Sequence, residues 1–419
     1  MKGVWKIRVD TGGTFTDAWG EDPDGTNSRC KVLSDGCLRL ELGEPEEDGW
    51  RRLGSHAAEW PDKLLLDWRT RNGKRVEGHK GGKILLRDPA PVVELSSNEE
   101  APVVAARILT RTPLGKGFPP LDLRVATTRG TNALLERKGA KVALFVNRGF
   151  EDLLDIRDQR RELLFSLAQP SYDSLAFRVY GITGRLSTQG HEVEEVDESE
   201  WKRMAREALK AGCEVAAVSL LNAWRESDHE LRLARLLKNE GFADVVCSSE
   251  VSPLIRLLPR TDTTVADAFL TLIMQRFISR VAEPFDHTSL SFMTSAGGLV
   301  PAARFHPKDS LLSGPAGGLI GAVEIGRAAG FERLLTFDMG GTSSDVARIE
   351  GAFSYSEEQQ VGAARVMAPA LRIETVAAGG GSICAWRNGQ LEVGPESAGA
   401  SPGPACYGRG GPFTLTDVN

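Results

Sequence analysis

One eight-residue pattern, Asp-x-Gly-Gly-Thr-x-x-Asp, occurs twice and constrains the fold more than any other feature of this 419-residue chain. The first copy begins at Asp10, near the N-terminus, and the second begins at Asp338. Each copy follows a short apolar stretch with the character of a β-strand, VWKIRV in one case and LLTF in the other. A repeat with this long separation predicts two related lobes that face each other.

The glycine pair in each copy would present backbone N–H groups to a phosphate, and the nearby hydroxyl groups would add donors. A single copy is equally compatible with an ordinary hairpin turn, because Asp and Gly are common in turns. A plain turn has no reason to repeat its threonine and its second aspartate, so the two copies together favour a nucleotide-phosphate site. The candidate nucleotide-binding residues in the two copies are Gly12, Gly13, Thr14, Thr16, Gly340, Gly341 and Thr342.

The first aspartate of each copy stands at the end of its strand, where a carboxylate can orient water or bind a hydrated cation. Mg²⁺ commonly takes one or two carboxylates and keeps much of its water. We therefore assign Asp10 and Asp338 as the candidate catalytic and metal-binding residues. The chain contains no Gly-x-x-x-x-Gly-Lys-Ser/Thr motif, so a P-loop is not the means of binding phosphate.

Two further glycine-rich turns flank the second copy. The run SGPAGG, with Gly314 and Gly317, leads into an apolar helical stretch, and N–H groups at a helix start can bind phosphate. The run of Gly379, Gly380 and Gly381 is a second turn that would contact ribose or phosphate. Each turn, taken alone, is also what a tight connection between a helix and a sheet looks like.

The rest of the chain alternates strands and helices, which is typical of an α/β protein. Its length favours several lobes, and we divide it into residues 1–120, 121–330 and 331–419. The first part combines the opening strands with a polar subdomain of short strands and turns. The second is an α/β portion with a connection to the next lobe, and the third begins a second lobe.

Composition excludes several classes of function. The net charge is −6 with no basic block, so the electrostatic signature of a nucleic-acid binder is missing. No apolar run is long enough to span a bilayer, and we expect no membrane partner. Six scattered cysteines without a C-x-x-C pair favour reduced thiols and a cytoplasmic location.

A series of motifs in order along nearly the whole chain resembles the hydantoinase A/5-oxoprolinase family. The strings that carry the resemblance are VDTGGTFTD, TTRGTNALLERKGAKVAL, SSEVSP, LSGPAGG, FDMGGTSSDV, VAAGGGSI and VGPESAGASPGPACYGRGGP. The resemblance implies an actin-like ATPase fold (ribonuclease H-like) with duplicated lobes. It also implies ATP-dependent hydrolysis of a cyclic amide, either 5-oxoproline to glutamate or a related hydantoin, by phosphorylation of the lactam oxygen.

The same resemblance extends to individual residues outside the two copies. Thr128 and Asn132 match the block before the family's NALLE helix, and Arg157 and Arg160 follow a Gly-Phe pair and are suited to holding a carboxylate or phosphate. All four are candidate substrate residues. The chain departs from the family pattern at Glu374, where many members have histidine, and at Arg129, where relatives often have a small or apolar residue.

A short stretch follows Asp338, so we expect the second lobe to be incomplete in this chain. The resemblance then implies a front portion that needs a hydantoinase B-like region or subunit, with ATP and Mg²⁺ as cofactors, in an oligomer. Two alternatives remain open at this point. One is an ATP-dependent ketone carboxylase subunit of the acetone carboxylase type, and the other is a non-catalytic nucleotide-binding fragment.

Overall fold

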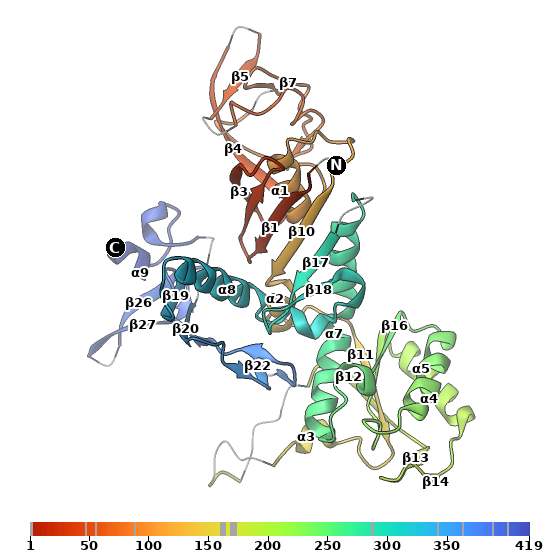
Figure 1. Ribbon diagram of the computed structural model, residues 1–419. Coiled ribbons are helices and arrows are strands. Elements are labelled where there is room, and N and C mark those ends of the chain that lie inside the picture. The colour runs from red at the N-terminus through yellow and green to blue at the C-terminus, as the bar shows by residue number, and fades with distance from the viewer. Residues whose placement is uncertain are drawn as a thin grey trace.

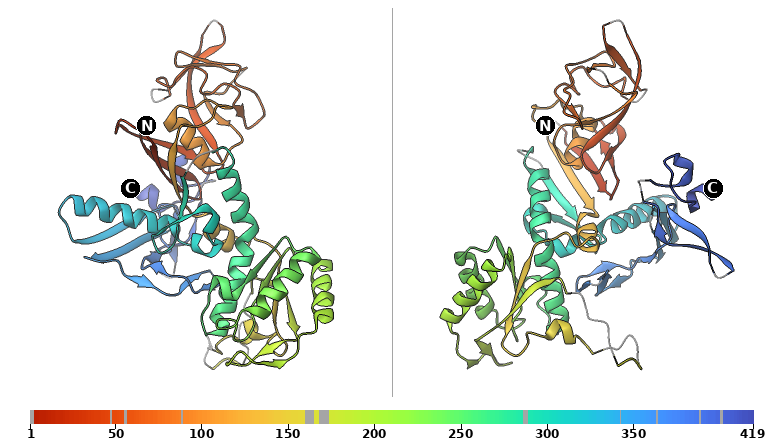
Figure 2. Two further views of the ribbon diagram at one scale, coloured as in Figure 1. Left: turned by 45° about the vertical axis from the view of Figure 1, so that its right-hand side comes forward. Right: turned by 180° about the vertical axis from the view of Figure 1, so that it is seen from behind.

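The computed structural model describes residues 3–46, 48–54, 57–87, 89–159, 165–167, 174–285, 289–341, 343–362, 364–387, 389–399 and 402–419. These residues form a mixed α/β fold, as the alternating sequence pattern predicts. Figures 1 and 2 show a β-rich part at one end, an α/β unit at the other, and a C-terminal arm of hairpins beside the long helix α7.

The first lobe is built on a six-stranded sheet with the order β18-β17-β10-β1-β2-β3. Strands β1, β10 and β17 are parallel, whereas β1, β2 and β3 form an antiparallel meander. Helix α1 packs on the meander, and Gly20 gives it room because a Cβ there would lie 3.2 Å from Leu109. The elements are β1 (Trp5–Thr11), β2 (Phe15–Glu21), β3 (Asn27–Leu33), β10 (Leu121–Thr127), β17 (Ser289–Met293), β18 (Leu299–Pro301) and α1 (Ala101–Thr110).

A second six-stranded sheet, with the order β6-β9-β4-β5-β8-β7, fills the stretch that the sequence predicts as short strands and turns. It has an apolar interior, because Leu64, Leu65 and Trp68 are fully buried, so this subdomain is less polar than expected. Its strands are β4 (Cys37–Pro45), β5 (Trp50–Leu53), β6 (Arg69–Thr70), β7 (Gly78–Lys80), β8 (Lys83–Leu85) and β9 (Val92–Ser96).

The α/β unit has a parallel four-stranded sheet with the order β12-β11-β15-β16. Helix α4 buries Trp201 and Ala205 on its apolar stripe, and Gly241 ends α5 in the left-handed conformation. The elements are β11 (Val142–Asn147), β12 (Ala176–Ile182), β13 (Arg185–Leu186), β14 (Glu192–Glu194), β15 (Val215–Val218), β16 (Asp244–Cys247), α2 (Arg129–Leu135), α3 (Leu153–Ile156), α4 (Glu198–Lys210), α5 (Asp228–Glu240), α6 (Ser248–Val251) and α7 (Leu257–Ala282).

The C-terminal part is dominated by antiparallel strands in its described residues. Helix α8 (Ser313–Ala328) packs against a three-stranded sheet, β19-β20-β25, and also contacts β1 and β10 of the first lobe. Figure 1 shows α8 between the two sheets. The other elements are β19 (Arg333–Met339), β20 (Ser344–Glu350), β21 (Tyr355–Ser356), β22 (Gln359–Val361), β23 (Ala364–Val366), β24 (Ala370–Leu371), β25 (Glu374–Val376), β26 (Ser382–Arg387), β27 (Gln390–Ser397), α9 (Leu415–Val418) and 3₁₀ turns at Ala302–Arg304, Pro307–Ser310 and Ala405–Tyr407.

The apolar core is distributed unevenly among these parts. The largest buried cluster runs from the first lobe into one face of the α/β unit, and a second cluster lies on that unit's other face. The third cluster is small and joins α8 to β20, with Ala316, Leu319 and Val323 against Ala347 and Ile349. In the described part of the chain, none of the helices has the length and apolarity that a membrane crossing requires.

Candidate functional site

The two copies of the repeated pattern fold into the same kind of hairpin. In the first copy Asp10 is opposite Asp17 across β1 and β2, and the N–H of Gly12 donates to the carbonyl oxygen of Phe15 over 3.0 Å. The second copy repeats both features. Asp338 is opposite Asp345, and the N–H of Gly340 donates to Ser343 over 2.9 Å.

The similarity extends beyond the turns to a third strand. Strand β3 pairs with β2 in the first lobe, and β25 pairs with β20 in the second sheet, both antiparallel.

Thr16 is fully buried, and its hydroxyl group is 3.1 Å from the hydroxyl group of Ser34. Thr16 therefore ties β2 to the segment after β3 and does not face a phosphate, whereas Thr14 is exposed at the turn. Thr342, its counterpart in the second copy, lies outside the described residues.

Asp10 and Asp338 lie close enough for their charges to interact. Desolvation by the surrounding protein is the largest cause that raises the pKa of Asp10, followed by the charges of Asp17 and Asp338. The side chain of Asp10 is nevertheless exposed, so it stands in an open space with protein around it. A carboxylate with acidic neighbours and access to solvent is suited to binding a hydrated cation.

The start of helix α8, which includes the predicted site residue Gly314, lies close to the carboxylate of Asp10. Leu312 precedes the helix in the left-handed conformation, with φ of 56°. A Cβ at Gly314 would lie 3.4 Å from Oδ1 of Asp10 and 3.1 Å from Cγ2 of Thr128. A side chain at this position would crowd Thr128, so glycine eases the close approach, and the free N–H groups at the start of the helix are those of Ser313 and Gly314, because Pro315 has none.

Thr128 and Asn132 lie directly behind the first turn. The N–H and hydroxyl groups of Thr128 both donate to the carbonyl oxygen of Thr11, over 2.9 and 3.2 Å. The amide group of Asn132 donates to the hydroxyl group of Thr128 over 3.3 Å, and a Cβ at Gly13 would lie 3.3 Å from that amide nitrogen. The structure thus brings these two predicted residues together with Asp10, Gly13 and Gly314.

Sequence reasoning missed two residues at this place. Ser313 accepts a hydrogen bond from the N–H of Thr127 over 3.2 Å and donates to its carbonyl oxygen over 2.8 Å, which fixes α8 to the end of β10. The hydroxyl group of Thr11 is buried with no hydrogen-bond partner among the described residues. The signal for both was their position, next to Gly314 and next to Asp10.

The run of three glycines supports the second turn through its backbone. The N–H groups of Gly380 and Gly381 donate to the carbonyl oxygens of Gly340 and Gly341, over 2.9 and 2.7 Å, and the N–H of Gly379 donates to Ser382. These three N–H groups are therefore already used within the protein, and the predicted contact of this turn with ribose or phosphate stays a prediction. The close contact explains the glycines, because a Cβ at Gly381 would lie 2.9 Å from the oxygen of Gly341.

Gly317, unlike Gly314, has a structural use that does not involve the candidate site. It is the fifth residue of α8, where its N–H belongs to the helix's own hydrogen bonds. A Cβ there would lie 3.5 Å from Cβ of Ala126, so Gly317 lets the helix pack closely on β10. The sequence predicts a glycine-rich turn before the helix, but the helix already begins at Ser313 and includes the whole run. Only the start of the run lies at the candidate site.

The predicted arginines lie elsewhere. Arg157 forms an ion pair with Asp262 over 3.4 Å and lines a water-sized pocket that Arg365 also lines. Burial raises the pKa of Asp262 to about 6, against the opposing effect of Arg157 and Arg365. Arg160 lies outside the described residues.

The two departures from the family pattern have structural partners. Arg129 donates to Glu100 over 3.0 Å and stacks on the ring of Phe277 at 4.5 Å, so it fixes the start of α2 between α1 and α7. Glu374 is an exposed residue of β25 that pairs with Arg372 over 3.3 Å.

No group of three or more His, Cys, Asp and Glu side chains in the described ranges is arranged to hold a metal ion. The predicted Mg²⁺ site needs fewer protein ligands than this, because waters and nucleotide phosphates supply the others. The residues present therefore fit such a site, with Asp10 as the carboxylate best placed for it.

Comparison with solved structures shows which proteins have a similar fold. The crystal structure of the ATP-dependent caprolactamase from Pseudomonas jessenii is similar over 99% of this chain and 54% of its own, with a TM-score of 0.68 and 26% identity. The nucleotide-free structure of acetone carboxylase is similar over 95% of this chain and 52% of its own, with a TM-score of 0.68. At 22% identity, the second likeness concerns the fold alone.

Sequence relatives include 5-oxoprolinase 1 of Arabidopsis thaliana, 36% identical over 383 residues, which cover 82% of this chain and 30% of the relative. The caprolactamase subunit alpha of Pseudomonas jessenii is 35% identical over 330 residues, or 75% of this chain and 47% of that subunit. This chain thus spans less than half the length of either relative. The family model described as the hydantoinase/oxoprolinase N-terminal region matches residues 91–241, and the one described as hydantoinase/oxoprolinase matches residues 260–419. The chain belongs to the hydantoinase/oxoprolinase family.

Proposed function

We propose that this chain supplies the nucleotide-binding part of an ATP-dependent enzyme that hydrolyses a cyclic amide. The observation that carries the proposal is the pair of matching hairpin turns, whose aspartates Asp10 and Asp338 are within electrostatic reach of each other. The N–H groups of Gly12 and Gly340 close the two turns, so Gly13 and Gly341 are the glycines whose N–H groups would serve as donors for one polyphosphate. The start of α8 at Gly314 adds further N–H groups beside Asp10.

The proposed architecture is that of an actin-like ATPase with duplicated lobes. Support comes from the third strand, which joins the hairpin in the same way in both sheets. In this proposal residues 1–120 and 121–330 form the first lobe and its connection, and residues 331–419 begin the second lobe.

The chemistry that we propose uses ATP to activate a poor electrophile. A ring amide is stabilised by resonance, and transfer of the γ-phosphoryl group to the lactam oxygen makes its carbon susceptible to attack by water. The C–N bond of this adduct then opens to release the amine and leave an acyl phosphate, and a second water hydrolyses the acyl phosphate to a carboxylate and inorganic phosphate. The protein contributes positioning and charge stabilisation. Bound Mg²⁺ would neutralise phosphate charge, with Asp10 and Asp338 as its carboxylates.

The relatives favour a lactam as the substrate. The proteins named 5-oxoprolinase 1 and caprolactamase subunit alpha are 36% and 35% identical to this chain in sequence. In the structural comparison the caprolactamase is 26% identical to this chain and acetone carboxylase 22%. The relative named caprolactamase subunit alpha also supports a partner, and we propose a hydantoinase B-like region or subunit for this chain. Thr128 and Asn132 are the proposed substrate-side residues, because they adjoin the first turn.

The first experiment is a calorimetric titration of the 419-residue chain with Mg²⁺ and a non-hydrolysable ATP analogue. We expect saturable binding that Asp338→Ala abolishes and that Asp24→Asn, in the exposed turn after β2, leaves unchanged. If the chain does not bind, or if Asp338→Ala binds equally well, the two-turn site is wrong.

The second experiment tests the reaction in the presence of a hydantoinase B-like partner. ATP hydrolysis is measured with 5-oxoproline, caprolactam, hydantoin or acetone. Stimulation by a cyclic amide supports the proposal, and stimulation by acetone alone supports the carboxylase reading. Nucleotide binding without stimulation by any of the four contradicts the proposed reaction while leaving the nucleotide site intact.

A further inference from the structure

The parallel sheet of the α/β unit reverses its strand order at one point, and this point lies far along the sequence from both repeated turns. In its parallel sheet, β11 lies between β12, the next strand in the chain, and β15, which follows later. The connections after β11 and β15 therefore leave in opposite directions. In open parallel sheets, ligands bind at the carboxyl ends of the strands where this reversal occurs.

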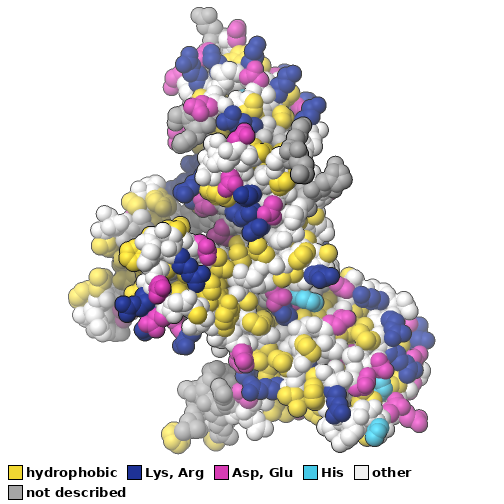
Figure 3. All heavy atoms as spheres, in the orientation of Figure 1, with side chains coloured by type: hydrophobic (Ala, Val, Ile, Leu, Met, Phe, Trp, Pro, Cys, Tyr) yellow, Lys and Arg dark blue, Asp and Glu magenta, His cyan; other side chains and the backbone are white. Residues whose placement is uncertain are grey.

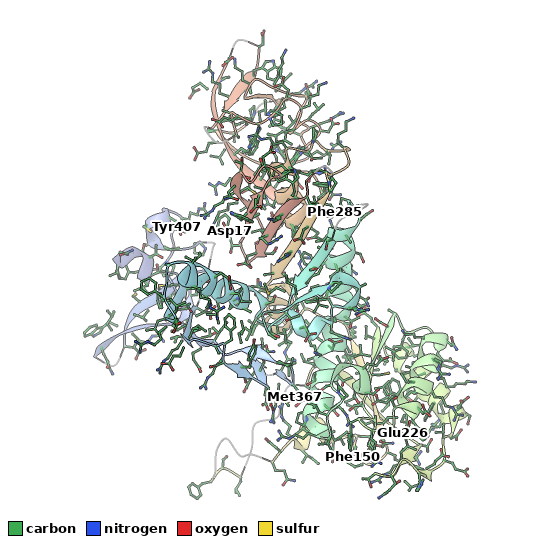
Figure 4. All side chains as sticks on the ribbon, viewed as in Figure 1. Asp17, Phe150, Glu226, Phe285, Met367 and Tyr407 are labelled. Atoms are coloured by element: carbon green, nitrogen blue, oxygen red, sulfur yellow. The ribbon has the colours of Figure 1, made fainter. Side chains whose placement is uncertain are left out.

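The structure has an open pocket of about 710 Å³ at that position. Its lining comes from the segments that follow three strands: Arg148 after β11, Asn222 after β15, and Arg185 after β12. This volume is within the range of small-molecule sites. Figure 4 places Phe150, after β11, and Glu226, after β15, at the same end of the unit.

Buried hydrogen bonds hold these segments together. Asn147, the last residue of β11, is buried, donates to the carbonyl oxygen of Gly184 over 2.7 Å and accepts from the N–H of Leu221 over 2.7 Å. Asn222 adopts the left-handed conformation, with φ of 61°, and donates to the carbonyl oxygen of Leu186 over 2.8 Å. The rim of the pocket is thus fixed without a ligand.

Two opposite charges in the lining are left without ion-pair partners. Arg185 and Glu194 are opposite each other in the β13–β14 hairpin, so both side chains lie on one face. Within the described ranges neither forms an ion pair, and the guanidinium group of Arg185 has only a ring contact with Phe150. Arg148, by contrast, is neutralised by Glu200.

We propose that this pocket binds a small α-amino acid. Its carboxylate would pair with the guanidinium group of Arg185 in a two-point contact, and its ammonium group would pair with Glu194. The adjacent charges of an α-amino acid match two charged residues that are neighbours across a hairpin. Leu186, Val193 and Leu221 line the same pocket and provide an apolar surface for an aliphatic side chain.

The test is a calorimetric titration of the 419-residue chain with L-alanine, L-leucine and L-glutamate. We expect saturable binding of at least one of them. N-Acetyl-L-leucine, which lacks the ammonium group, and L-leucinamide, which lacks the carboxylate, are expected to bind at least tenfold more weakly than L-leucine. Saturable binding of inorganic phosphate without any of the amino acids would overturn the proposal.

Variants locate the binding. Arg185→Gln and Glu194→Gln are each expected to weaken binding at least tenfold with an unchanged thermal midpoint, since Arg185 is exposed, Glu194 is half-buried, and neither forms an ion pair among the described residues. Arg178→Gln, an exposed arginine on β12 outside the pocket, is the matched control and is expected to bind normally. Asp338→Ala is expected to bind normally too, which separates this site from the nucleotide site. Unweakened binding in Arg185→Gln, or no saturable binding by any of the three amino acids, contradicts the proposal.

Discussion

The two hairpin sheets have matching strands but very different surroundings. In β1, Ile7 and Val9 are 0% and 4% exposed. In β19, the residues at the same distance before the aspartate are Leu335 and Phe337, which are 78% and 69% exposed. The apolar pattern is the same in both strands, so the pattern predicts what a strand is suited to bury and not whether it is buried.

The difference has two visible causes. Helix α1 covers the β1–β2–β3 meander, and β10 pairs with the outer edge of β1. Among the described strands, β19 pairs with β20 alone, and α8 packs on the opposite face of its sheet. Figure 3 shows apolar side chains gathered on the exposed surface around α8. An exposed apolar surface of this kind is typical of an interaction site.

The largest effect that we expect separates the two sheets by stability. Ile7→Ala removes fully buried methyl groups and is expected to lower the free energy of unfolding by about 2–5 kcal/mol. Leu335→Ala is expected to change it by less than about 0.5 kcal/mol, because the side chain is mostly exposed. Urea unfolding measures both, and equal losses would show that β19 is covered as β1 is.

The second prediction tests whether the two turns are equivalent in function. Asp10→Asn and Asp338→Asn are each expected to weaken binding of the Mg²⁺–ATP analogue by about 100-fold, or about 2.7 kcal/mol. Calorimetry measures both affinities, with Asp24→Asn as the control. A large loss in one variant and none in the other would show that the hairpins share a shape without sharing a ligand.

The third prediction concerns the run of three glycines that holds the second turn in place. Gly381→Ala would place a Cβ 2.9 Å from the oxygen of Gly341 and 3.0 Å from Oγ of Ser397, which must displace the turn. We expect nucleotide affinity to fall by about tenfold, or about 1.4 kcal/mol. Gly318→Ala is the matched control, because nothing lies within 4 Å of a Cβ there. Equal affinities of the two variants would mean that the glycine run does not position the turn.

The smallest effect is a dependence of stability on pH. The raised pKa of Asp10 means that its charged form is disfavoured in the folded chain, so the native state loses stability as pH rises through that pKa. Asp10→Asn removes this cost and is expected to raise the thermal midpoint of the ligand-free chain slightly at neutral pH. The gain should vanish below the ordinary value of 3.8, which thermal melting across this range tests. A lower midpoint at neutral pH would contradict the sign.

Much of the fold was predictable because it is encoded in local patterns. The buried run at Val142–Asn147 and the left-handed Gly241 after α5 follow from hydrophobicity and backbone preference alone. The repeated pattern predicted two related structures, and both copies fold as hairpins. The uses of Gly317 and Gly381 were not predictable, because each depends on a backbone brought close by tertiary packing. The exchange of hydrogen bonds between Ser313 and Thr127 spans 186 residues and has no local signal.

Helix α8 gives this asymmetric pair of sheets a mechanical link. Its first turn is fixed beside Asp10, and its length of about 24 Å extends along the second sheet. A tilt of about 10° at its first turn would carry its far end about 4 Å, since a 16-residue helix moves as a rigid rod. A ligand that binds at Gly314 would therefore act at the fixed end of this rod. A small rotation at that end would produce a larger displacement of β19 and β20 at the other.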